Sequence, residues 1–283
     1  MATDVQQKSD VTHHYLRAKK KFPNVWCAGC GNGIVMGALI RAIDRLGLDK
    51  DGVAVVSGIG CSSRLPVYLD FNTLHTTHGR ALAFATGVKF AKPELKVIVI
   101  TGDGDALAIG GNHFIHACRR NIDITTILIN NKIYGMTGGQ FSPTTTAGAH
   151  ATTAPYGNYE KQFDISKLAI AAGASYVARG TVYHVQQLEK LIQGAISKKG
   201  FAVVEAVSNC HTYYGRMNRE GDAVAMIGWM KDHAMPIQAA VKLPPEKMAG
   251  KFVTGLLHET DATEFCEEYR MLVERLAAKE ESK

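Results

Sequence analysis

Two short apolar runs, separated by one helix-length segment, constrain the fold of this chain more than any other feature. Residues 96–101 and 124–130 are rich in β-branched side chains, and the segment between them has the length and composition of a crossover helix. Apolar runs of this kind are typical of strands buried on both faces, and a helical crossover joins parallel strands. The chain is therefore predicted to contain a parallel α/β sheet.

The same alternation of strands and helices extends along the chain. It predicts helices at residues 32–46, 164–172, 185–197 and 261–283, and further strands at 53–56, 175–178 and 201–207. We expect the strand at residues 201–207 to complete the sheet. Residues 140–156 form a connection too long for a simple turn, which makes them a candidate lid or partner contact.

Polar residues follow the two central strands. Asp103 and Asp105 come directly after the first strand, and Asn130 and Asn131 follow the second. The carboxyl ends of parallel strands share one edge of the sheet, where ligands bind. Carboxylate and amide oxygens suit Mg²⁺ that also binds phosphate oxygens, so a magnesium diphosphate site is expected. The alternative is an ordinary strand-to-helix turn, in which Gly and Asp are common.

Composition excludes several other classes. The 283 residues are 46% hydrophobic and 20% charged, enough for a full core and one large α/β domain with extensions. We see neither an apolar run of about eighteen residues nor the apolar core of a signal peptide, so we expect a cytoplasmic protein and no membrane contact. A charge of +6 without a basic, aromatic stripe argues against nucleic acid. The short basic cluster Lys19, Lys20 and Lys21 is either a solvated surface or a steering patch for an acidic partner.

Six cysteines raise the question of metal binding, because disulfides are not expected in a chain without an export signal. Cys27 and Cys30 form a C-x-x-C turn among glycines, and Cys61 and Cys210 each follow a predicted strand. This spacing is not that of a zinc ribbon, and it leaves open a redox dithiol, a zinc site and an iron–sulfur cluster. The remaining two, Cys118 and Cys266, lie in predicted helices as small buried hydrophobes.

Six ordered motifs carry a family resemblance. They are WCAGCG, SGIGCSSR, HGRALAFATGVK, GDGD with the later NN, YGMTGGQ and SNC, and they span roughly residues 22 to 217. The GDGD to NN unit resembles the pyrophosphate-binding domain of thiamine diphosphate enzymes. The complete set resembles the β subunit of 2-oxoacid:ferredoxin oxidoreductases, and YGMTGGQ resembles its 2-oxoglutarate branch.

The resemblance implies a fold and a set of cofactor ligands. It implies the thiamine diphosphate-binding fold in residues 1–217, a mainly parallel sheet with helices on both faces, followed by an extension at 218–283 that contacts a partner subunit. It makes Asp103, Asn131 and the carbonyl of Ile133 magnesium ligands, and Cys27, Cys30, Cys61 and Cys210 the ligands of a four-iron, four-sulfur cluster. The residues expected around thiamine diphosphate are Gly60, Cys61, Ser62, Ser63, His78, Gly102, Asp103, Gly104, Asp105, Asn131, Ile133, Tyr134, Gly135, Met136 and Thr137.

The resemblance also implies a reaction. A 2-oxo acid, coenzyme A and oxidised ferredoxin would give an acyl-CoA, CO₂ and reduced ferredoxin, reversibly. Thiamine diphosphate supplies the decarboxylation chemistry, and a nearby cluster implies that electrons leave singly. The aminopyrimidine pocket belongs to an α subunit, so the chain is expected to work only in an αβ or (αβ)₂ assembly.

Three residues receive expected roles beside the cofactor. Arg64 is expected to bind the substrate carboxylate, with a structural role as the alternative. His78 is expected to donate a hydrogen bond or relay a proton, unless it is a helix-capping or core histidine. Met136 is expected to shape the substrate pocket. Pyruvate or a branched-chain 2-oxo acid is the rival substrate, and a non-redox thiamine enzyme or a zinc-stabilised scaffold subunit is the rival type of protein.

Overall fold

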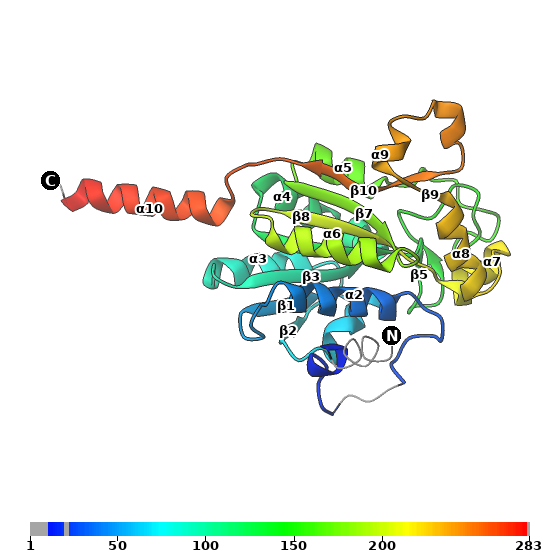
Figure 1. The fold of residues 1–283 in the computed structure, drawn as a ribbon, viewed down its shortest axis with the longest axis horizontal. Coiled ribbons are helices and arrows are strands. Elements are labelled where there is room, and N and C mark those ends of the chain that lie inside the picture. Colours follow the sequence, from blue (N-terminus) through cyan, green and yellow to red (C-terminus); the bar gives the residue numbers. More distant parts are fainter. Residues whose placement is uncertain (1–10, 20–22, 282–283) are drawn as a thin grey trace.

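The sheet holds eight strands in the part of the chain that the structure describes, residues 11–19 and 23–281 of a computed structural model. Their order is β2-β1-β3-β4-β8-β7-β10-β9 (Figure 1). The strands are β1 (Val53–Ser57), β2 (Asn72–His75), β3 (Lys96–Gly102), β4 (Ile124–Asn130), β7 (Tyr176–Thr181), β8 (Ala202–Val207), β9 (Ala234–Pro236) and β10 (Phe252–Glu259). The pairs from β2 through β7 are parallel, as the crossover pattern predicts.

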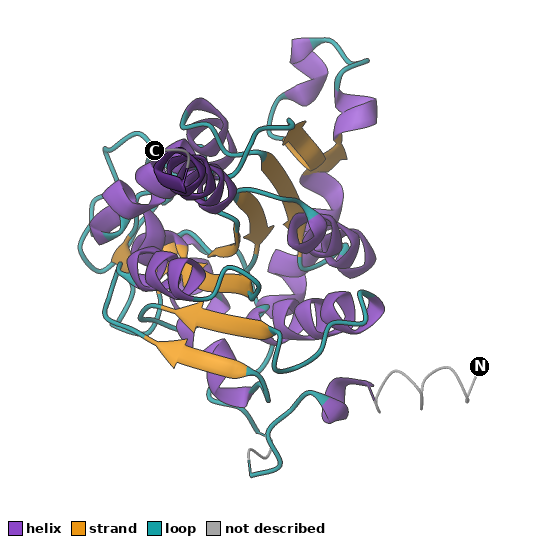
Figure 2. Cartoon of the chain, turned by 90° about the vertical axis from the view of Figure 1, so that its left-hand side faces the viewer, coloured by secondary structure: helices purple, strands orange, loops and turns teal. Residues whose placement is uncertain are grey.

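Helices cover both faces of this sheet, which gives three layers (Figure 2). One face carries α2 (Asn32–Arg45) and α6 (Val185–Ser197), and the other carries α3 (Ala81–Ala91), α4 (Gly111–Arg120) and α5 (Ile165–Ala171). Because β1, β3, β4 and β8 are central, nearly all of their side chains are buried, which explains their continuous apolar runs. The predicted class and the predicted crossover are confirmed.

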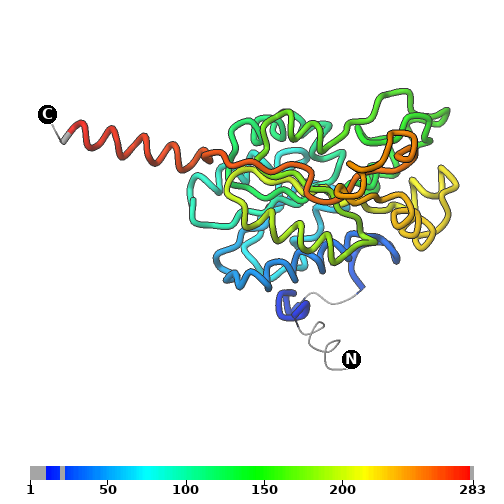
Figure 3. The backbone as a smooth tube through the Cα atoms, turned by 45° about the horizontal axis from the view of Figure 1, so that its top comes forward, coloured from blue at the N-terminus to red at the C-terminus, as the bar shows by residue number. Residues whose placement is uncertain are grey.

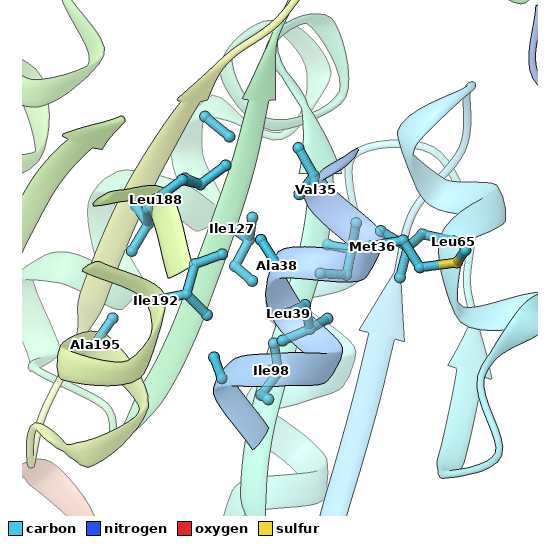
Figure 4. Packing of buried hydrophobic residues seen from close by; sticks show 14 of the residues in the cluster. Val35, Met36, Ala38, Leu39, Leu65, Ile98, Ile127, Leu188, Ile192 and Ala195 are labelled. Carbon is cyan, nitrogen blue, oxygen red and sulfur yellow. The ribbon is translucent and has the colours of Figure 1, made fainter. Parts of the chain in front are cut away.

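The larger core lies between α2, α6 and the sheet (Figure 4). Val35 and Leu39 of α2 and Ile192 of α6 are fully buried there, at the spacing of an amphipathic helix that packs on a sheet. Leu65 reaches the same cluster from η1 (Ser62–Tyr68), the 3₁₀ helix that follows Cys61. The segment that carries Cys61 is therefore anchored in the main core.

The C-terminal part corrects one expectation. The sheet does not end at β8, because β10 pairs antiparallel with β7 and β9 pairs with β10. The β10 strand was missed because its composition, FVTGLLHE, lacks a continuous apolar run and its burial is mixed. The helices of this part are α7 (Arg216–Asn218), α8 (Ala223–His233), α9 (Ile237–Ala240) and η4 (Pro245–Met248).

The last helix, α10 (Phe265–Glu281), confirms the predicted terminal helix and extends away from the body (Figures 1 and 3). Cys266 near its start is only partly buried, whereas Cys118 in α4 is fully buried. The expectation of a buried small hydrophobe is thus correct for Cys118 and wrong for Cys266. None of the helices in the described ranges is long and apolar enough to cross a membrane.

Candidate active site

Four parallel strands deliver the predicted site residues to one edge of the sheet. β1, β3, β4 and β8 are adjacent and in register, with Ser57 beside Ile100, Gly102 beside Ile129 and Asn130 beside Val207. Their carboxyl ends therefore lie together, where the loops of a parallel sheet form ligand sites. Cys61, Asp103, Asn131 and Cys210 each follow one of these ends by one to four residues.

A pocket of about 160 Å³ opens at this edge. It is lined by every residue predicted around thiamine diphosphate except Ser63, together with Ile59 and Ile129, which the sequence analysis missed. Small-molecule sites usually measure about 300–1,000 Å³, so this pocket has the size of part of a site. A larger ligand that binds here by one end would need additional residues, beyond those of this pocket, to enclose the rest of it.

Asp103 is the most confined acid of the pocket. The side chain is 3% exposed, and its Oδ2 accepts hydrogen bonds from Ser142 Oγ and Thr144 Oγ1, each at 2.6 Å. Burial raises the pKa of Asp103 to about 6, against the lowering effect of these two hydroxyls and of nearby backbone amides. A buried carboxylate of this kind gains most from a cation beside it.

The two asparagines after β4 have different surroundings. Asn130 donates from Nδ2 to Glu205 Oε1 at 2.9 Å and accepts from the Lys132 amide at 3.2 Å, so it supports the turn. Asn131 lines the pocket, and its Oδ1 accepts only the Ile133 amide at 3.2 Å. Lys132, the residue after Asn131, has a left-handed backbone with φ of 63°, which tightens the turn. Asn131 is thus the one of the two asparagines that lines the pocket.

Gly104 permits a close contact that a larger residue would block. A Cβ at this position would lie 2.3 Å from the ring of Tyr134, whose hydroxyl donates to the Gly104 carbonyl at 3.0 Å. Tyr134 comes from the short hairpin of β5 (Ile133–Tyr134) and β6 (Gln140–Phe141). Burial raises the pKa of Tyr134 to about 12, with smaller contributions from the two aspartates, so the hydroxyl remains a donor.

Asp105 orients its neighbours instead of facing the pocket with a free carboxylate. Its Oδ1 accepts the amides of Ile59 and Gly79 at 3.2 and 2.7 Å, and its Oδ2 accepts Thr101 Oγ1 at 2.8 Å. His78 Nδ1 lies 2.6 Å from Oδ1, which ties the imidazole to this carboxylate. The capping alternative for His78 is wrong, since Arg80 is the N-cap of α3, and the side chain of His78 is 37% exposed in the pocket wall.

The other residues with expected substrate roles lie farther out. Met136 lines the pocket and is 41% exposed, at its mouth. Arg64 is exposed on η1 and does not line the pocket, and no described residue pairs with its guanidinium. Ser63 is fully buried behind the wall. Lys20 and Lys21 of the basic cluster lie outside the described residues, whereas Lys19 is exposed.

Four cysteines gather next to this pocket. The thiol of Cys30 lies close enough to those of Cys27, Cys61 and Cys210 for each of them to raise its pKa. Cys61 also lines the pocket. Burial raises the pKa of Cys30 to about 12 and that of Cys61 to about 11. A Cβ on Gly135 would be 3.4 Å from Cys61 Sγ and 3.8 Å from Cys210 Sγ, so this one residue of the pocket wall lies against two of the thiols.

Hydrogen bonds hold the cysteine loops together. Trp26 Nε1 donates to the Cys61 carbonyl at 2.7 Å, and Asn209 Nδ2 donates to the Gly29 carbonyl at 3.1 Å. The first bond joins the C-x-x-C turn to the loop after β1, and the second joins it to the loop after β8. Segments up to 180 residues apart in sequence thus converge on one site.

The donor set fits an iron–sulfur cluster better than one zinc ion. A tetrahedral zinc site with bonds of about 2.3 Å needs sulfurs about 3.8 Å apart. In the described ranges no three His, Cys, Asp or Glu side chains are arranged to hold one ion, although the thiols are neighbours. Four thiols that come from separate loops can hold a larger group, an iron–sulfur cluster.

Unpaired buried polar atoms point the same way. Eight buried side-chain atoms in the described part of the chain form no hydrogen bond, although one of them, Glu189 Oε1, is ion-paired with Arg45 at 2.8 Å. Six of the eight belong to residues within two positions of a cysteine. These six are Asn32 Nδ2, Asn32 Oδ1, Ser63 Oγ, Ser208 Oγ, Asn209 Oδ1 and His211 Nδ1. Buried polar groups are normally paired, so this concentration indicates that a polar or charged group belongs among the cysteines.

Comparisons with known proteins agree with this geometry. The profile of the thiamine pyrophosphate enzyme C-terminal TPP binding domain matches residues 58–206. The 2-oxoglutarate synthase subunit KorB of Methanocaldococcus jannaschii is 53% identical over 262 residues, which cover 93% of this chain and 97% of the relative. This chain belongs to the β subunits of the 2-oxoacid:ferredoxin oxidoreductases.

Further similarities narrow the branch within these β subunits. The KorB subunit of Archaeoglobus fulgidus is 64% identical over 199 residues, 70% of this chain and 74% of the relative. A solved 2-oxoglutarate:ferredoxin oxidoreductase from Magnetococcus marinus, with 2-oxoglutarate, coenzyme A and succinyl-CoA bound, superposes with a TM-score of 0.84 at 36% identity. The match covers 94% of this chain and 90% of that one. The expected family and the expected fold are confirmed.

Proposed function

We propose that this chain is the β subunit of a 2-oxoglutarate:ferredoxin oxidoreductase. In the net reaction, 2-oxoglutarate, coenzyme A and two oxidised one-electron ferredoxins give succinyl-CoA, CO₂, two reduced ferredoxins and one proton. One observation carries the proposal: Gly135 lies at the same time in the wall of the Asp103–Asn131 pocket and against Cys61 and Cys210. A site for carbanion chemistry and a site for electron transfer are therefore in contact.

The pocket residues would hold the magnesium diphosphate end of thiamine diphosphate. Asp103 supplies a carboxylate, Asn131 an amide oxygen and Ile133 a backbone carbonyl, the hard oxygen ligands that Mg²⁺ prefers. Gly104 lets the ring of Tyr134 pack directly on the GDGD turn, and Tyr134 and Thr137 line the same wall. Bound thiamine diphosphate supplies the electron sink for decarboxylation of a 2-oxo acid.

Cys27, Cys30, Cys61 and Cys210 would hold a four-iron, four-sulfur cluster. Burial raises the pKa values of Cys30, Cys61 and Cys210 and favours their neutral thiols, so deprotonation would require the positive charge of bound iron. Cys27 is exposed, which leaves this corner of the cluster open to an external acceptor. A separate ferredoxin fits that role because the chain contains no second set of four cysteines.

His78 would act on the cofactor and substrate through Nε2. Asp105 accepts the hydrogen of Nδ1 at 2.6 Å, which leaves Nε2 as the nitrogen available to the pocket that His78 lines. Arg64 and Met136 would contact the substrate, and Arg64 would bind the carboxylate of the substrate. Because the guanidinium of Arg64 is exposed and does not line the pocket, it would contact the substrate only once a partner subunit completes the site.

The partner proposals follow from this incomplete site. An α subunit would complete the pocket with the aminopyrimidine wall, in an αβ or (αβ)₂ assembly that works in the cytoplasm. Residues 218–283 are the proposed contact with that subunit, because α10 extends from the body with most of its surface exposed. The chain alone is expected to be inactive.

A substrate panel tests the proposal. The αβ complex, purified without oxygen and supplied with Mg²⁺, thiamine diphosphate, coenzyme A and ferredoxin, should reduce ferredoxin with a higher kcat/KM for 2-oxoglutarate than for pyruvate or branched-chain 2-oxo acids. Preference for pyruvate would move the chain to another branch. Failure with every 2-oxo acid, together with one zinc per chain, would favour the scaffold subunit.

A further inference from the structure

Residues 142–146, Ser-Pro-Thr-Thr-Thr, place four hydroxyls behind the pocket. We call these residues the hydroxyl segment. Ser142, Thr144 and Thr145 are 1%, 3% and 0% exposed, although the segment belongs to the long connection after β6. A connection normally runs over the surface, so burial of three hydroxyl-bearing residues here needs a physical reason.

The first reason is Asp103. Ser142 Oγ and Thr144 Oγ1 both donate to the same carboxylate oxygen, Oδ2, at 2.6 Å. No side chain of the described residues bonds the other oxygen, Oδ1. Two short hydrogen bonds to Oδ2 fix the plane of the carboxylate and leave Oδ1 as the oxygen available to a cation.

The second reason is the turn of Asn131 to Ile133. Thr145 Oγ1 donates to the Lys132 carbonyl at 2.6 Å, and Lys132 Nζ donates to Thr146 Oγ1 at 3.2 Å. The carbonyl of Thr145 in turn accepts Asn158 Nδ2 at 2.9 Å, which anchors the segment to the following loop. The hydroxyl segment therefore binds the turn at Lys132, between the two expected oxygen ligands, the side chain of Asn131 and the carbonyl of Ile133.

These contacts span the two halves of one cation site. Asp103 follows β3 and Asn131 follows β4, and no hydrogen bond between described residues joins Asp103 directly to Asn131 or Ile133. The hydroxyl segment bonds both sides within five residues. Its length and its hydrogen bonds therefore determine how far apart the oxygens of Asp103 and of the turn can lie.

We propose that Ser142, Thr144 and Thr145 are positioning residues that hold this cation site at the size of Mg²⁺. Mg²⁺ requires near-ideal octahedral geometry at about 2.0–2.1 Å, whereas Ca²⁺ accepts flexible sites at about 2.3–2.6 Å. A rigid brace between the two ligand sources favours the smaller ion. The inference rests on the proposed function, because it assumes that the pocket takes Mg²⁺ and thiamine diphosphate.

The test measures ion selectivity in the complete αβ complex. Mg²⁺ and Ca²⁺ are titrated separately at saturating thiamine diphosphate, with binding followed by calorimetry. For the double variant Ser142→Ala/Thr144→Val, we expect Mg²⁺ affinity to fall about 10- to 100-fold, the usual loss when partners of metal ligands are removed. Ca²⁺ affinity should fall by less, so the preference for Mg²⁺ narrows.

Two matched variants control for general damage. Thr144→Ser retains a hydroxyl and should keep nearly the wild-type preference. Thr125→Val removes another buried hydroxyl bond, from Thr125 Oγ1 to the Ala195 carbonyl at 3.1 Å, away from the site, and should leave both affinities unchanged. If the double variant does not fold, Thr145→Val alone releases the turn and should narrow the preference in the same direction.

The outcomes separate this inference from the proposed function. Unchanged Mg²⁺ affinity in the double variant, or equal losses for both ions, would overturn the positioning role while leaving the cofactor site intact. Failure of the wild-type complex to bind Mg²⁺ with thiamine diphosphate would instead refute the proposed function on which it rests.

Discussion

The diphosphate pocket and the cysteine site lie side by side but are stabilised in opposite ways. In the pocket, Asp103 already accepts hydrogen bonds from two side-chain hydroxyls. Asp105 accepts hydrogen bonds from two backbone amides, one hydroxyl and one imidazole. Around the cysteines, six buried polar atoms have no partner and the buried thiols have raised pKa values. The pocket is organised by the chain itself, whereas the cysteine site is left to be completed by what binds there.

This difference indicates which half tolerates the loss of its ligand. A site held by its own hydrogen bonds keeps its shape when empty, so binding requires little rearrangement. A site of unpaired polar atoms gains stability only when the missing group is present. Mutations in the two halves should therefore have separable effects, and the following experiments are ordered from the largest expected effect to the smallest.

Loss of one cluster cysteine should give the largest effect. Cys210→Ala removes one of four ligands, so the complex should lose its iron and sulfide and should reduce no ferredoxin, because the electron path is gone. Binding of Mg²⁺ and thiamine diphosphate should stay at the wild-type affinity, measured by calorimetry. Retention of full iron in this variant would remove Cys210 from the ligand set.

Asp103→Asn should affect the opposite half. The neutral amide removes the buried charge that a cation compensates, so Mg²⁺ affinity should fall by at least about 100-fold, the upper range for loss of a group that only supports a ligand. Iron content should not change. Asp70→Asn, which breaks only an exposed pair with Lys50, is the control and should bind Mg²⁺ normally.

Gly104→Ala tests how closely the pocket is packed. The new methyl group would lie 2.3 Å from the ring of Tyr134, so the ring or the GDGD turn must move. We expect about a 10-fold loss of cofactor affinity, equivalent to about 1.4 kcal/mol and typical of overpacking. Gly111→Ala, whose Cβ would meet nothing within 4 Å, is the matched variant, and an equal loss there would contradict the steric explanation.

The structural change that follows removal of the cluster should be small and confined to the cysteine loops. After iron is extracted with a chelator under reducing conditions, Cys27, Cys30, Cys61 and Cys210 should become available to a thiol reagent, with the exposed Cys27 modified first. Cys118 is 0% exposed and should remain unmodified in both states, read by mass spectrometry. Labelling of Cys118 at the same rate would mean that the whole domain opens, against the local change expected here.

The sequence predicted the position of a site residue correctly where a single strand determines that position. The strands before Asp103, Asn131, Cys61 and Cys210 could be recognised from their apolar runs, and parallel strands bring their ends together whatever the loops do. The shared edge of the sheet was therefore predictable, whereas the ligands of these residues stay a prediction. The strand β10 was not, because a partly exposed antiparallel edge strand carries a weaker pattern than a buried parallel one.

The supporting contacts could not be predicted in the same way. Ser142 and Thr144 lie about 40 residues from Asp103 in sequence, in a loop rich in hydroxyls that resembles many exposed loops. Asp105 was expected to line the diphosphate and it does line the pocket, but its hydrogen bonds to His78 and two loop amides were not predicted. The hydrogen-bond partners of two nearby aspartates depend on side-chain packing between separate loops, which no local sequence pattern predicts.

The most direct test is the iron, acid-labile sulfide and zinc content of the αβ complex purified without oxygen. The account predicts about four iron and four sulfide per β chain and no zinc, as a cubane cluster on four cysteines requires. About one zinc and no sulfide would contradict it, because the cysteine site would then be structural and the adjacent pocket would have no path for electrons.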